Sequence, residues 1–318
     1  MPKIITKSSI TKFESDSFII NRNETYNKQL ELDDSIWLNW KFQKCPTGKA
    51  NLSLLTDKEE IFGCNAFGPL SDIHFSGDKH SIWLSLENFI HPNYQRKGYF
   101  HQLLNNSEKL LSTDSNTIMM SFPNDKSIKA YKNNDWIHRS NYINHWVKFN
   151  LTQNLLLHFI DLKKEFKSIG IKPLNCTLSS MNLIHFKNVV TTYWSTKLLN
   201  WRFNEYPQSY YQTIILNDIE GVIRLGKRGR LNEAQILFLN DKTNSLKRNT
   251  LILWINELKK QIKVDLITFP TSKDNPFTKI LKTIGFVQLR SRANFIFKSN
   301  SIQTNTKFSI SGIDFHTY

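Results

Sequence analysis

One sequence pattern occurs twice in this chain of 318 residues, and the repetition limits its possible folds more than any other feature. Asn39–Pro46 reads N-W-K-F-Q-K-C-P, and Asn200–Pro207 reads N-W-R-F-N-E-Y-P. A second pair follows in the same order, because Ser121–Pro123 (S-F-P) is echoed by Thr268–Pro270 (T-F-P). Two echoes in one order predict two copies of a single domain.

The repeat sets the expected domain boundaries. We expect an N-terminal domain over residues 1–150, a connecting helix over 151–165, a C-terminal domain over 166–300 and a tail over 301–318. Trp40 and Trp201, at the centre of the first echo, are expected to anchor the two cores, because large aromatic side chains usually do so.

The hydrophobic pattern is similar in the two copies. Each reads as a β-hairpin, a third strand, an amphipathic helix, a buried strand, a helix-like stretch and a closing strand. Strands and helices alternate only after an early antiparallel run, which predicts the α/β class with a mixed, mostly antiparallel sheet flanked by helices in each copy. The expected elements span residues 50–55, 60–66, 81–90, 100–112, 117–122, 127–134 and 141–149 in the first copy, and 210–216, 221–225, 233–240, 245–262, 264–269 and 292–298 in the second.

Composition excludes several classes. No apolar run is long enough for a membrane span, and the polar N-terminus lacks a signal-peptide pattern, so a cytoplasmic protein is expected. Cys45, Cys64 and Cys176 are scattered and odd in number. They form neither a disulfide framework nor a zinc pattern, and no metal is expected.

The formal net charge of +15 suits an anionic partner such as nucleic acid or a phosphorylated small molecule. The basic residues are dispersed, however, and the densest cluster, Lys227–Arg230, reads as a hairpin turn. A lysine-rich solvated surface therefore explains the charge better than a nucleic-acid interface.

The segment Ile90–Phe100 (I-H-P-N-Y-Q-R-K-G-Y-F) is the strongest chemical signal. It runs from a strand through a Pro- and Gly-containing turn directly into a helix. Helix N-termini present unpaired N–H groups and a partial positive charge, which bind phosphate. Gly98 lets the backbone approach an anion closely, and Arg96 and Lys97 can add charge.

Here the sequence resembles the Gcn5-related N-acetyltransferase (GNAT) superfamily. Its signature, [Q/R]-x-x-G-x-[G/A], holds the pyrophosphate of acetyl-CoA, and Gln95, Gly98 and Phe100 stand at its three marked positions. Phe100 departs from the usual small residue, but the whole segment follows a branch of the superfamily that reads V-H-P-x-Y-R-G-K-G-I-F.

A second motif supports the resemblance. The superfamily often carries N-x-x-A-x-x-x-Y-x-x-x-G-F after its fifth strand. Asn124, Ser127 and Tyr131 match this spacing, and Asp135–Trp136 replaces Gly-Phe. The resemblance covers about residues 35–150, with the second half a divergent copy.

The resemblance implies an acyl-CoA cosubstrate, most simply acetyl-CoA, and direct acyl transfer to an amine. Tyr131 would be the acid that protonates the leaving sulfur, and Glu87, on the same strand as Phe89 and Ile90, is our candidate base ahead of His91. The implied cofactor-binding residues are Phe89, Ile90, Gln95, Arg96, Lys97, Gly98, Tyr99, Phe100, Asn124 and Ser127.

The second copy lacks both parts of this pattern. No glycine occurs between Phe238 and Trp254, and counting back from Gly285–Phe286 places Leu281 at the tyrosine position. We therefore predict that only the N-terminal copy binds coenzyme A and that the second copy shapes the acceptor pocket or stabilises the first.

The leading functional hypothesis is N-acyl transfer to a small-molecule amine. By analogy with its branch, we expect an amino sugar, free or nucleotide-linked, as in polysaccharide biosynthesis. Two alternatives remain open: an aminoacyl-tRNA-dependent transferase of related tandem fold, and a non-catalytic acyl-CoA sensor. The sequence leaves the acyl chain length and the oligomeric state open.

Overall fold

The computed structural model describes residues 2–27, 34–150, 161, 164, 166–168, 178–207, 211–243, 245–290 and 293–315. The chain divides into two compact units. Unit 1 comprises Met1–Ser140, Glu205–Pro207 and Ala293–Asn305, and unit 2 comprises Asn141–Asn204, Gln208–Arg292 and Thr306–Tyr318.

Unit 1 contains a seven-stranded sheet in the order β1-β2-β3-β4-β5-β15-β6. Only the β4–β5 pair is parallel, so the sheet is mixed and mostly antiparallel, as the sequence predicts. Its strands are β1 (Lys3–Lys7), β2 (Asn51–Asp57), β3 (Glu60–Phe75), β4 (Asp78–Ile90), β5 (Thr117–Ser121), β6 (Ile137–Arg139) and β15 (Phe295–Ser299).

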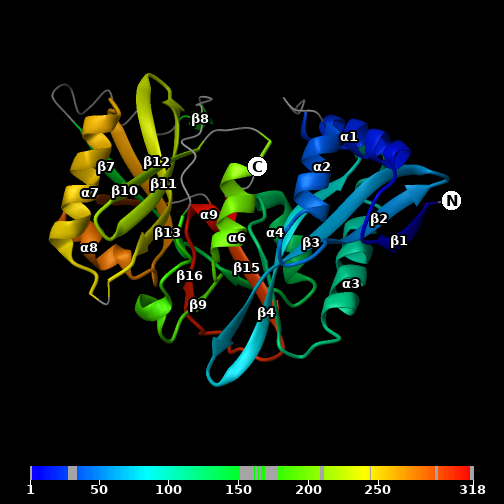
Figure 1. Cartoon of the computed structure of the whole chain (residues 1–318). Coiled ribbons are helices and arrows are strands. Elements are labelled where there is room, and N and C mark those ends of the chain that lie inside the picture. Colours follow the sequence, from blue (N-terminus) through cyan, green and yellow to red (C-terminus); the bar gives the residue numbers. More distant parts are fainter. Residues whose placement is uncertain are drawn as a thin grey trace. The chain divides into compact units, whose positions relative to one another are not determined.

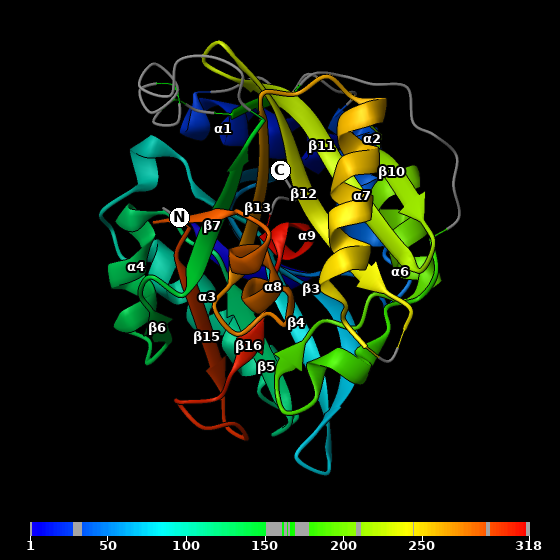
Figure 2. The ribbon, with the colours of Figure 1, turned by 90° about the vertical axis from the view of Figure 1, so that its left-hand side faces the viewer.

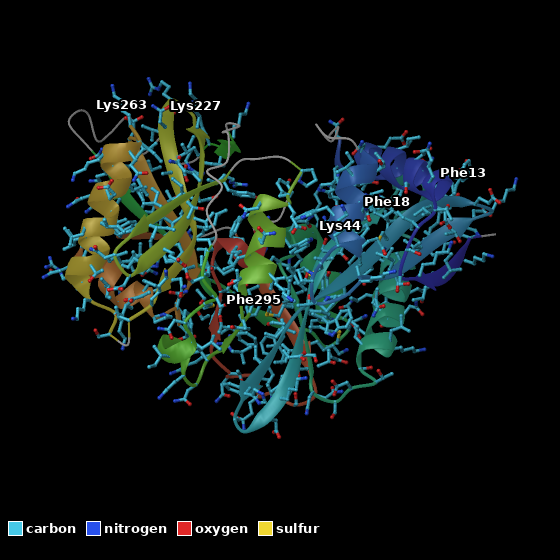
Figure 3. All side chains as sticks on the ribbon, in the orientation of Figure 1. Phe13, Phe18, Lys44, Lys227, Lys263 and Phe295 are labelled. Carbon is cyan, nitrogen blue, oxygen red and sulfur yellow. The ribbon has the colours of Figure 1, made fainter. Side chains whose placement is uncertain are left out.

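Helices cover both faces of this sheet (Figure 1). On α1, Phe18 is fully buried against the sheet, whereas Phe13 is 57% exposed (Figure 3). Helix α3 packs on the opposite face because Leu103, Leu104 and Leu111 form an apolar stripe along it. The helices are α1 (Lys12–Tyr26), α2 (Asp34–Gln43), α3 (Tyr99–Leu111) and α4 (Asp125–Lys132), with a 3-10 turn η1 (Pro92–Tyr94).

The β3–β4 hairpin is longer than the sequence predicts. The expected strands end at residue 66 and begin at residue 81, but pairing continues to a tight turn at Ser76 and Gly77, both with positive φ. The Ser-Gly-Asp sequence at this turn is the missed signal, since such residues favour left-handed turns.

Unit 2 contains a sheet in the order β10-β11-β12-β13-β7-β14, with β8 also pairing with β11. Figure 2 shows β10 to β13 and β7 of this sheet. The predicted turn at Lys227–Arg230 is confirmed, because it joins β11 to β12 with Gly229 at φ +61°. The strands are β7 (Ile143–Phe149), β8 (Phe166–Ser168), β10 (Tyr211–Leu216), β11 (Ile219–Arg228), β12 (Leu231–Asp241), β13 (Leu266–Ser272) and β14 (Val287–Arg290).

The helices of unit 2 follow the same scheme, with α7 packed on β10 and β11. A two-stranded sheet pairs β9 with β16. The remaining elements are η2 (Leu183–Phe186), β9 (Val190–Thr191), α6 (Thr196–Leu199), the π-helical turn η3 (Asn200–Asn204), α7 (Arg248–Gln261), α8 (Phe277–Thr283), β16 (Phe308–Ser309) and α9 (Gly312–Phe315).

The two units repeat one topology, which confirms the predicted tandem arrangement. The order β2-β3-β4-β5-β15-β6 in unit 1 matches β10-β11-β12-β13-β7-β14 in unit 2. The strands β4 and β12 each carry a bulge against the preceding strand. Trp40 and Trp201 are both buried, at 2% and 3% exposure.

The closing strands differ from the sequence prediction. The expected first-copy strand at 141–149 lies in the unit 2 sheet as β7, between β13 and β14. Strand β15, expected to close the second copy, lies in the unit 1 sheet between β5 and β6. Unit 1 therefore ends its first segment at Ser140 rather than at residue 150. Local strand patterns specify that a segment is extended, but not which sheet it joins.

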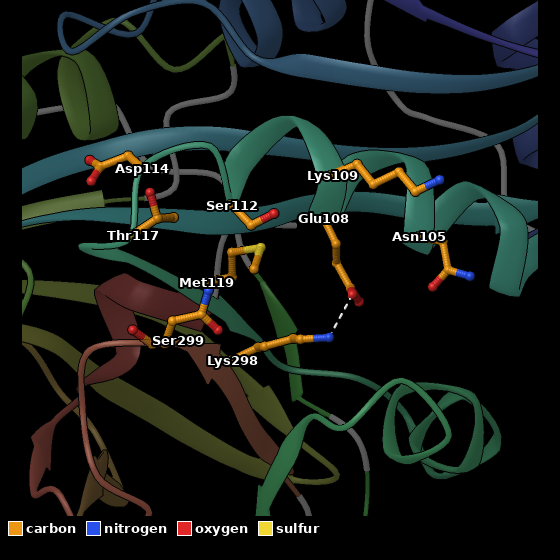
Figure 4. Close-up of a pocket in the computed structure, with 10 residues that line it drawn as sticks. Asn105, Glu108, Lys109, Ser112, Asp114, Thr117, Met119, Lys298 and Ser299 are labelled. Carbon is orange, nitrogen blue, oxygen red and sulfur yellow. Dashed lines mark hydrogen bonds and ion pairs between the residues drawn. The ribbon is translucent and has the colours of Figure 1, made fainter.

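Strand β15 is fixed in unit 1 by a polar contact with α3. Lys298 Nζ donates to Glu108 Oε2 at 2.7 Å, and Trp136 Nε1 donates to the other oxygen at 2.6 Å. Figure 4 shows this ion pair at the edge of a small cavity of about 280 Å³. Glu108 thus ties α3, β15 and the segment between α4 and β6 together.

Two further predictions concern the connecting helix and the C-terminal tail. The predicted connecting helix at 151–165, apart from Asp161 and Lys164, lies outside the described residues, as does Cys176. The predicted tail at 301–318 contains β16 and α9, which belong to unit 2. Among the described helices, none is long and apolar enough to cross a membrane.

Candidate functional site

The β4–α3 loop begins with η1 and ends in two residues with left-handed backbone. Arg96 has φ +61° and Gly98 has φ +79°. Gln95 Nε2 donates to the carbonyl of Ile90 at 2.8 Å, and Lys97 Nζ donates to the carbonyl of Asn93 at 2.9 Å. The first bond ties the loop to the end of β4, and the second links two residues within the loop.

Helix α3 begins without a side-chain cap. Gly98 is the N-cap, and the first intrahelical bond runs from Gln102 N–H to Gly98 O. The N–H groups of Tyr99, Phe100 and His101 precede that bond and point out of the helix end. An added Cβ at Gly98 would meet no atom within 4 Å. The predicted anion-binding elements therefore lie together at one open helix N-terminus.

Strands β4 and β5 separate beside this loop. Their parallel pairing runs from Ser81–Thr117 to Leu84–Met120, while β4 continues to Ile90. The bulge at Leu86, where Ser85 and Glu87 oppose consecutive β3 residues, marks the point of separation. One edge of β4 beyond Ser85 is thus not paired with β5.

The β3–β4 register shows which backbone groups face this open edge. His91 N–H donates to Phe62 O at 2.8 Å, so Ile90, a non-hydrogen-bonded partner of Gly63, directs its own N–H and C=O away from β3. By alternation, Phe89 faces β3 and Asn88 faces the open edge. Of the two residues predicted to bind the cofactor, Ile90 therefore presents its backbone to the open edge and Phe89 does not, while Asn88, which was not predicted, does.

Both open-edge carbonyls accept bonds from side chains. Gln95 binds Ile90 O, and Tyr26 Oη on α1 donates to Asn88 O at 2.5 Å. Tyr26 was not predicted, because nothing in the sequence of α1 connects it to β4.

Tyr131 on α4 reaches the same separation point from the face of the sheet that α3 covers. Its side chain is 1% exposed and packs against Phe100 and Trp136. Its hydroxyl accepts a bond from Ser121 Oγ, at the end of β5, at 3.2 Å. Burial raises the pKa of Tyr131, so the phenol is protonated at neutral pH. This state suits a proton donor.

Asn124 and Ser127 cap α4. Asn124 Oδ1 accepts from both the N–H and the hydroxyl of Ser127, at 3.0 Å each. The N-x-x-S spacing that matched the acyltransferase motif is also an N-cap pattern. The cap leaves the exposed Asn124 amide NH₂ group able to donate elsewhere, whereas Ser127 is used within the helix.

Glu87, the candidate base, is buried on the α1–α2 face. Lys41 Nζ lies 2.7 Å from Oε2 and Arg22 Nε lies 3.3 Å from Oε1. Burial alone would raise the pKa of Glu87, but the charges of Lys41 and Arg22 outweigh it and the pKa is lowered. A carboxylate held in this way is a weak base, so the geometry favours a role in positioning cations.

Unit 2 has the same strand and helix arrangement but lacks the candidate tyrosine and the glycine N-cap. Phe286 N–H donates to Leu281 O at 3.1 Å, as Trp136 N–H does to Tyr131 O at 3.2 Å. Leu281 therefore occupies the position of Tyr131, as predicted. Helix α7 begins after Lys247, with no glycine at that N-cap.

The strand separation in unit 2 is filled by the chain itself. Pairing of β12 with β13 ends at Gln235–Thr268. Beyond it, Ser272 N–H donates to Ile310 O at 2.8 Å, and α9 packs on both strands. The cavity left there has a volume of only about 10 Å³.

Comparison with known proteins gives a clear result for structure alone. The sequence matches no protein-family model and no curated protein. A GCN5-related N-acetyltransferase from Anabaena variabilis superimposes with a TM-score of 0.63 at 9% identity, over 96% of this chain and 75% of that one. A GCN5-related N-acetyltransferase from Kribbella flavida gives 0.59 at 9% identity, over 96% and 74%.

A tandem GNAT protein from the clavulanic acid biosynthesis pathway superimposes with a TM-score of 0.50 at 9% identity, over 95% of this chain and 100% of that one. The fold is that of a tandem GNAT. The predicted superfamily resemblance and tandem architecture are thus confirmed at the level of fold. Among the described residues of this tandem GNAT fold, no group of three or more His, Cys, Asp or Glu side chains is arranged to hold a metal ion.

Proposed function

We propose that this chain is an N-acyltransferase that moves an acyl group, most simply acetyl, from coenzyme A to a primary amine, with the cosubstrate held by unit 1. The observation that carries the proposal is the meeting of three features at one place. An uncapped helix N-terminus, an edge of β4 with which no described strand pairs and a buried protonated phenol all adjoin the β4–β5 separation.

The α3 N-terminus fits a pyrophosphate. Its free N–H groups and the helix dipole favour an anion. The open space around Gly98 lets the phosphate oxygens approach the backbone, and the exposed Arg96 and Lys97 side chains flank it.

The open edge of β4 fits the pantetheine arm. Asn88 and Ile90 present N–H and C=O groups in the orientation that a neighbouring strand would use. The amides of pantetheine can bind there as a strand-like extension, and the Asn124 amide can donate from the start of α4.

The thioester supplies an activated acyl group. The acceptor nitrogen attacks its carbonyl carbon, so that a C–N bond forms, the C–S bond breaks and the electron pair passes to sulfur. Tyr131 Oη donates a proton to that sulfur, and the proton lost by the new amide nitrogen restores the phenol through solvent. We assign no proton transfer to Glu87, because its carboxylate is ion-paired.

An amino sugar, free or nucleotide-linked, remains the acceptor that the sequence resemblance favours. The cytoplasm remains the expected compartment. The aminoacyl-tRNA alternative would show a steep loss of binding with added salt, and a sensor would bind acyl-CoA without turnover.

Calorimetric titration with acetyl-CoA tests the proposal. We expect one binding site per chain. Gly98→Glu should abolish binding, because it places a carboxylate where the phosphates are expected and strains a φ of +79°. Gly98→Ala is the matched control that carries the same strain without the charge, and it should retain measurable binding. Two equivalent sites, or unchanged affinity in Gly98→Glu, would contradict the assignment.

A further inference from the structure

Two serines on neighbouring strands lie beside the hydroxyl of Tyr131. Ser85 and Ser121 directly follow the last residue pair between β4 and β5. Ser85 is also paired with Phe67 on β3, and Phe67 belongs to the buried core cluster that contains Tyr131. Residues paired across a sheet share one face. Ser85 therefore lies on the same face as Tyr131, at the point where β4 and β5 separate.

A short series of hydrogen bonds orients Ser85. Asn65 Nδ2 donates to Asn88 Oδ1, and Asn88 Nδ2 donates to Ser85 Oγ at 2.5 Å. Asn65 is fully buried, and Ser85 is 8% exposed. The bulge at Leu86 brings Ser85 and Asn88, three positions apart, to one face of the sheet. Because Ser85 Oγ accepts from Asn88, its own hydrogen can point at Tyr131 Oη.

These side chains change the acidity of Tyr131. Burial raises the pKa of the phenol, and hydrogen bonding by Ser121, Ser85 and Asn65 lowers it in part. Among charged groups, the carboxylate of Glu108 on α3 raises this pKa further. A group that donates to the phenol oxygen favours the anionic form, and that form is the one left when the proton passes to sulfur.

Unit 2 has apolar residues at the three corresponding positions. The bulges of β4 and β12 align the two sheets. The alignment gives Ile236 for Ser85, Leu239 for Asn88 and Gly221 for Asn65. Unit 2 also carries Leu281 at the position of Tyr131. The polar side chains thus occur together with the phenol, which a role in the sheet scaffold alone does not explain.

We propose that Ser85 is a positioning residue for the proposed acid, with its hydroxyl oriented by Asn88 and donating to Tyr131 Oη. In the transfer step one proton moves from Tyr131 Oη to the thiolate sulfur, and Ser85 keeps its own hydrogen. Because Ser85 and Ser121 both donate to the phenol oxygen, Tyr131 is left with its own hydrogen to give to a ligand. The inference deepens the proposed function and rests on it.

The ionisation of Tyr131 tests the inference without any acceptor. A difluorotyrosine in place of Tyr131 titrates near neutral pH and gives a fluorine NMR signal distinct from every other tyrosine. We expect Ser85→Ala to raise its titration midpoint by about one pH unit, because the phenolate loses a donor. Ser121→Ala, which removes the donor at 3.2 Å, should act in the same direction. Ser85→Thr keeps the hydroxyl and should stay close to the unmodified value.

Ser53→Ala is the matched control. Ser53 is a buried serine of β2 in the same sheet, and its hydroxyl accepts from Ser107 Oγ at 2.8 Å. Its removal should leave the midpoint unchanged. Asn88→Leu removes the donor that orients Ser85 and should raise the midpoint. An unchanged midpoint in Ser85→Ala or Asn88→Leu, or an equal rise in Ser53→Ala, overturns the inference.

Kinetics separate the inference from the proposed function. With acetyl-CoA and a panel of primary amines that includes glucosamine, Ser85→Ala should lower kcat about tenfold, while the Kd for acetyl-CoA stays the same. In a Tyr131→Phe background it should cause no further loss, because Ser85 acts through the phenol. An equal loss in that background overturns the inference. Failure of the unmodified chain to bind acetyl-CoA or to release coenzyme A refutes the proposed function, and the titration still decides the role of Ser85.

Discussion

Tyr131 and Leu281 occupy the same position in the two units, and they show how little separates a scaffold from a candidate site. Each carbonyl accepts the N–H of an aromatic residue five positions later, and each side chain is buried. Tyr131 carries a hydroxyl, bonded to Ser121, where leucine has no polar group. That hydroxyl is the atom on which the proposed proton transfer depends.

Tyr131→Phe should separate rate from binding. Removing one proton donor should lower kcat by about 100-fold or more, while the Kd for acetyl-CoA stays the same. Loss of one buried hydrogen bond should lower the free energy of unfolding by about 1 kcal/mol. Steady-state kinetics, calorimetry and urea unfolding measure the three quantities. An unchanged kcat would remove Tyr131 from the mechanism.

Individual residues were predictable only where spacing encodes the backbone. Gly98 and the loop around it follow from a strand–turn–helix pattern. Glu87 could not be placed, because its partners Arg22 and Lys41 come from two helices distant in sequence. Lys41 did carry a signal: it lies in the repeated N-W-[K/R]-F pattern, and its counterpart Arg202 is also fully buried.

At the scale of elements, the same strand separation has opposite outcomes in the two units. In unit 1 the bonds that the described residues make to this edge of β4 come from the side chains of Tyr26 and Gln95. In unit 2 the carbonyl of Ile310 accepts a bond from β13, and α9 packs on both β12 and β13. This occupation, together with the missing glycine and tyrosine, supports one cosubstrate site per chain.

Asp314 on α9 should make the free energy of unfolding depend on pH. Its carboxylate accepts from Ser311 N–H and Trp194 Nε1, but burial raises its pKa from 3.8 to about 6. The folded state therefore holds this proton more tightly than the unfolded chain does. The contribution of protonated Asp314 to the free energy of unfolding is complete below about pH 4 and is lost as the pH rises through about 6.

Asp314→Asn should remove that dependence. The free energy of unfolding of the unmodified chain, minus that of the variant, should fall between about pH 4 and 6, by at most about 1.4 kcal/mol per pH unit. Chemical unfolding at several pH values measures both proteins. Parallel curves would show that Asp314 does not titrate in this range.

Helices α3, α4 and α7 were predictable, whereas β1, α1 and α2 lie in a stretch where no element was expected. The helices expected at 100–112, 127–134 and 245–262 correspond to α3, α4 and α7, because each has an amphipathic repeat and a clear start or stop. The exchanged closing strands were not predictable. Their alternating apolar residues fit either sheet, and the choice depends on contacts far along the chain.

At the scale of the molecule, neither unit is a continuous stretch of chain. Unit 1 needs β15 between β5 and β6, and unit 2 needs β7 between β13 and β14. Cutting the chain at residue 150, the boundary that the sequence suggests, would separate both sheets from a central strand.

A chain of residues 1–150 should therefore be unstable, with exposed strand edges and with Glu108 deprived of Lys298. Joining Ser140 directly to residues 293–305 should rescue it. Arg139 is paired with Phe295, so the join forms a three-residue hairpin loop. Thermal unfolding and light scattering compare the two. Equal stability would show that β15 is dispensable for unit 1.

The strand exchange also delays folding of the first sheet while the chain is synthesised on the ribosome. Ser140 emerges about 150 residues before Ala293, which at 5–20 residues per second is a delay of roughly 8–30 s. Throughout that interval β5 and β6 lack their shared neighbour, while β7 is complete and could enter the vacant slot. The nascent chain must therefore postpone closing its first sheet until β15 has been made.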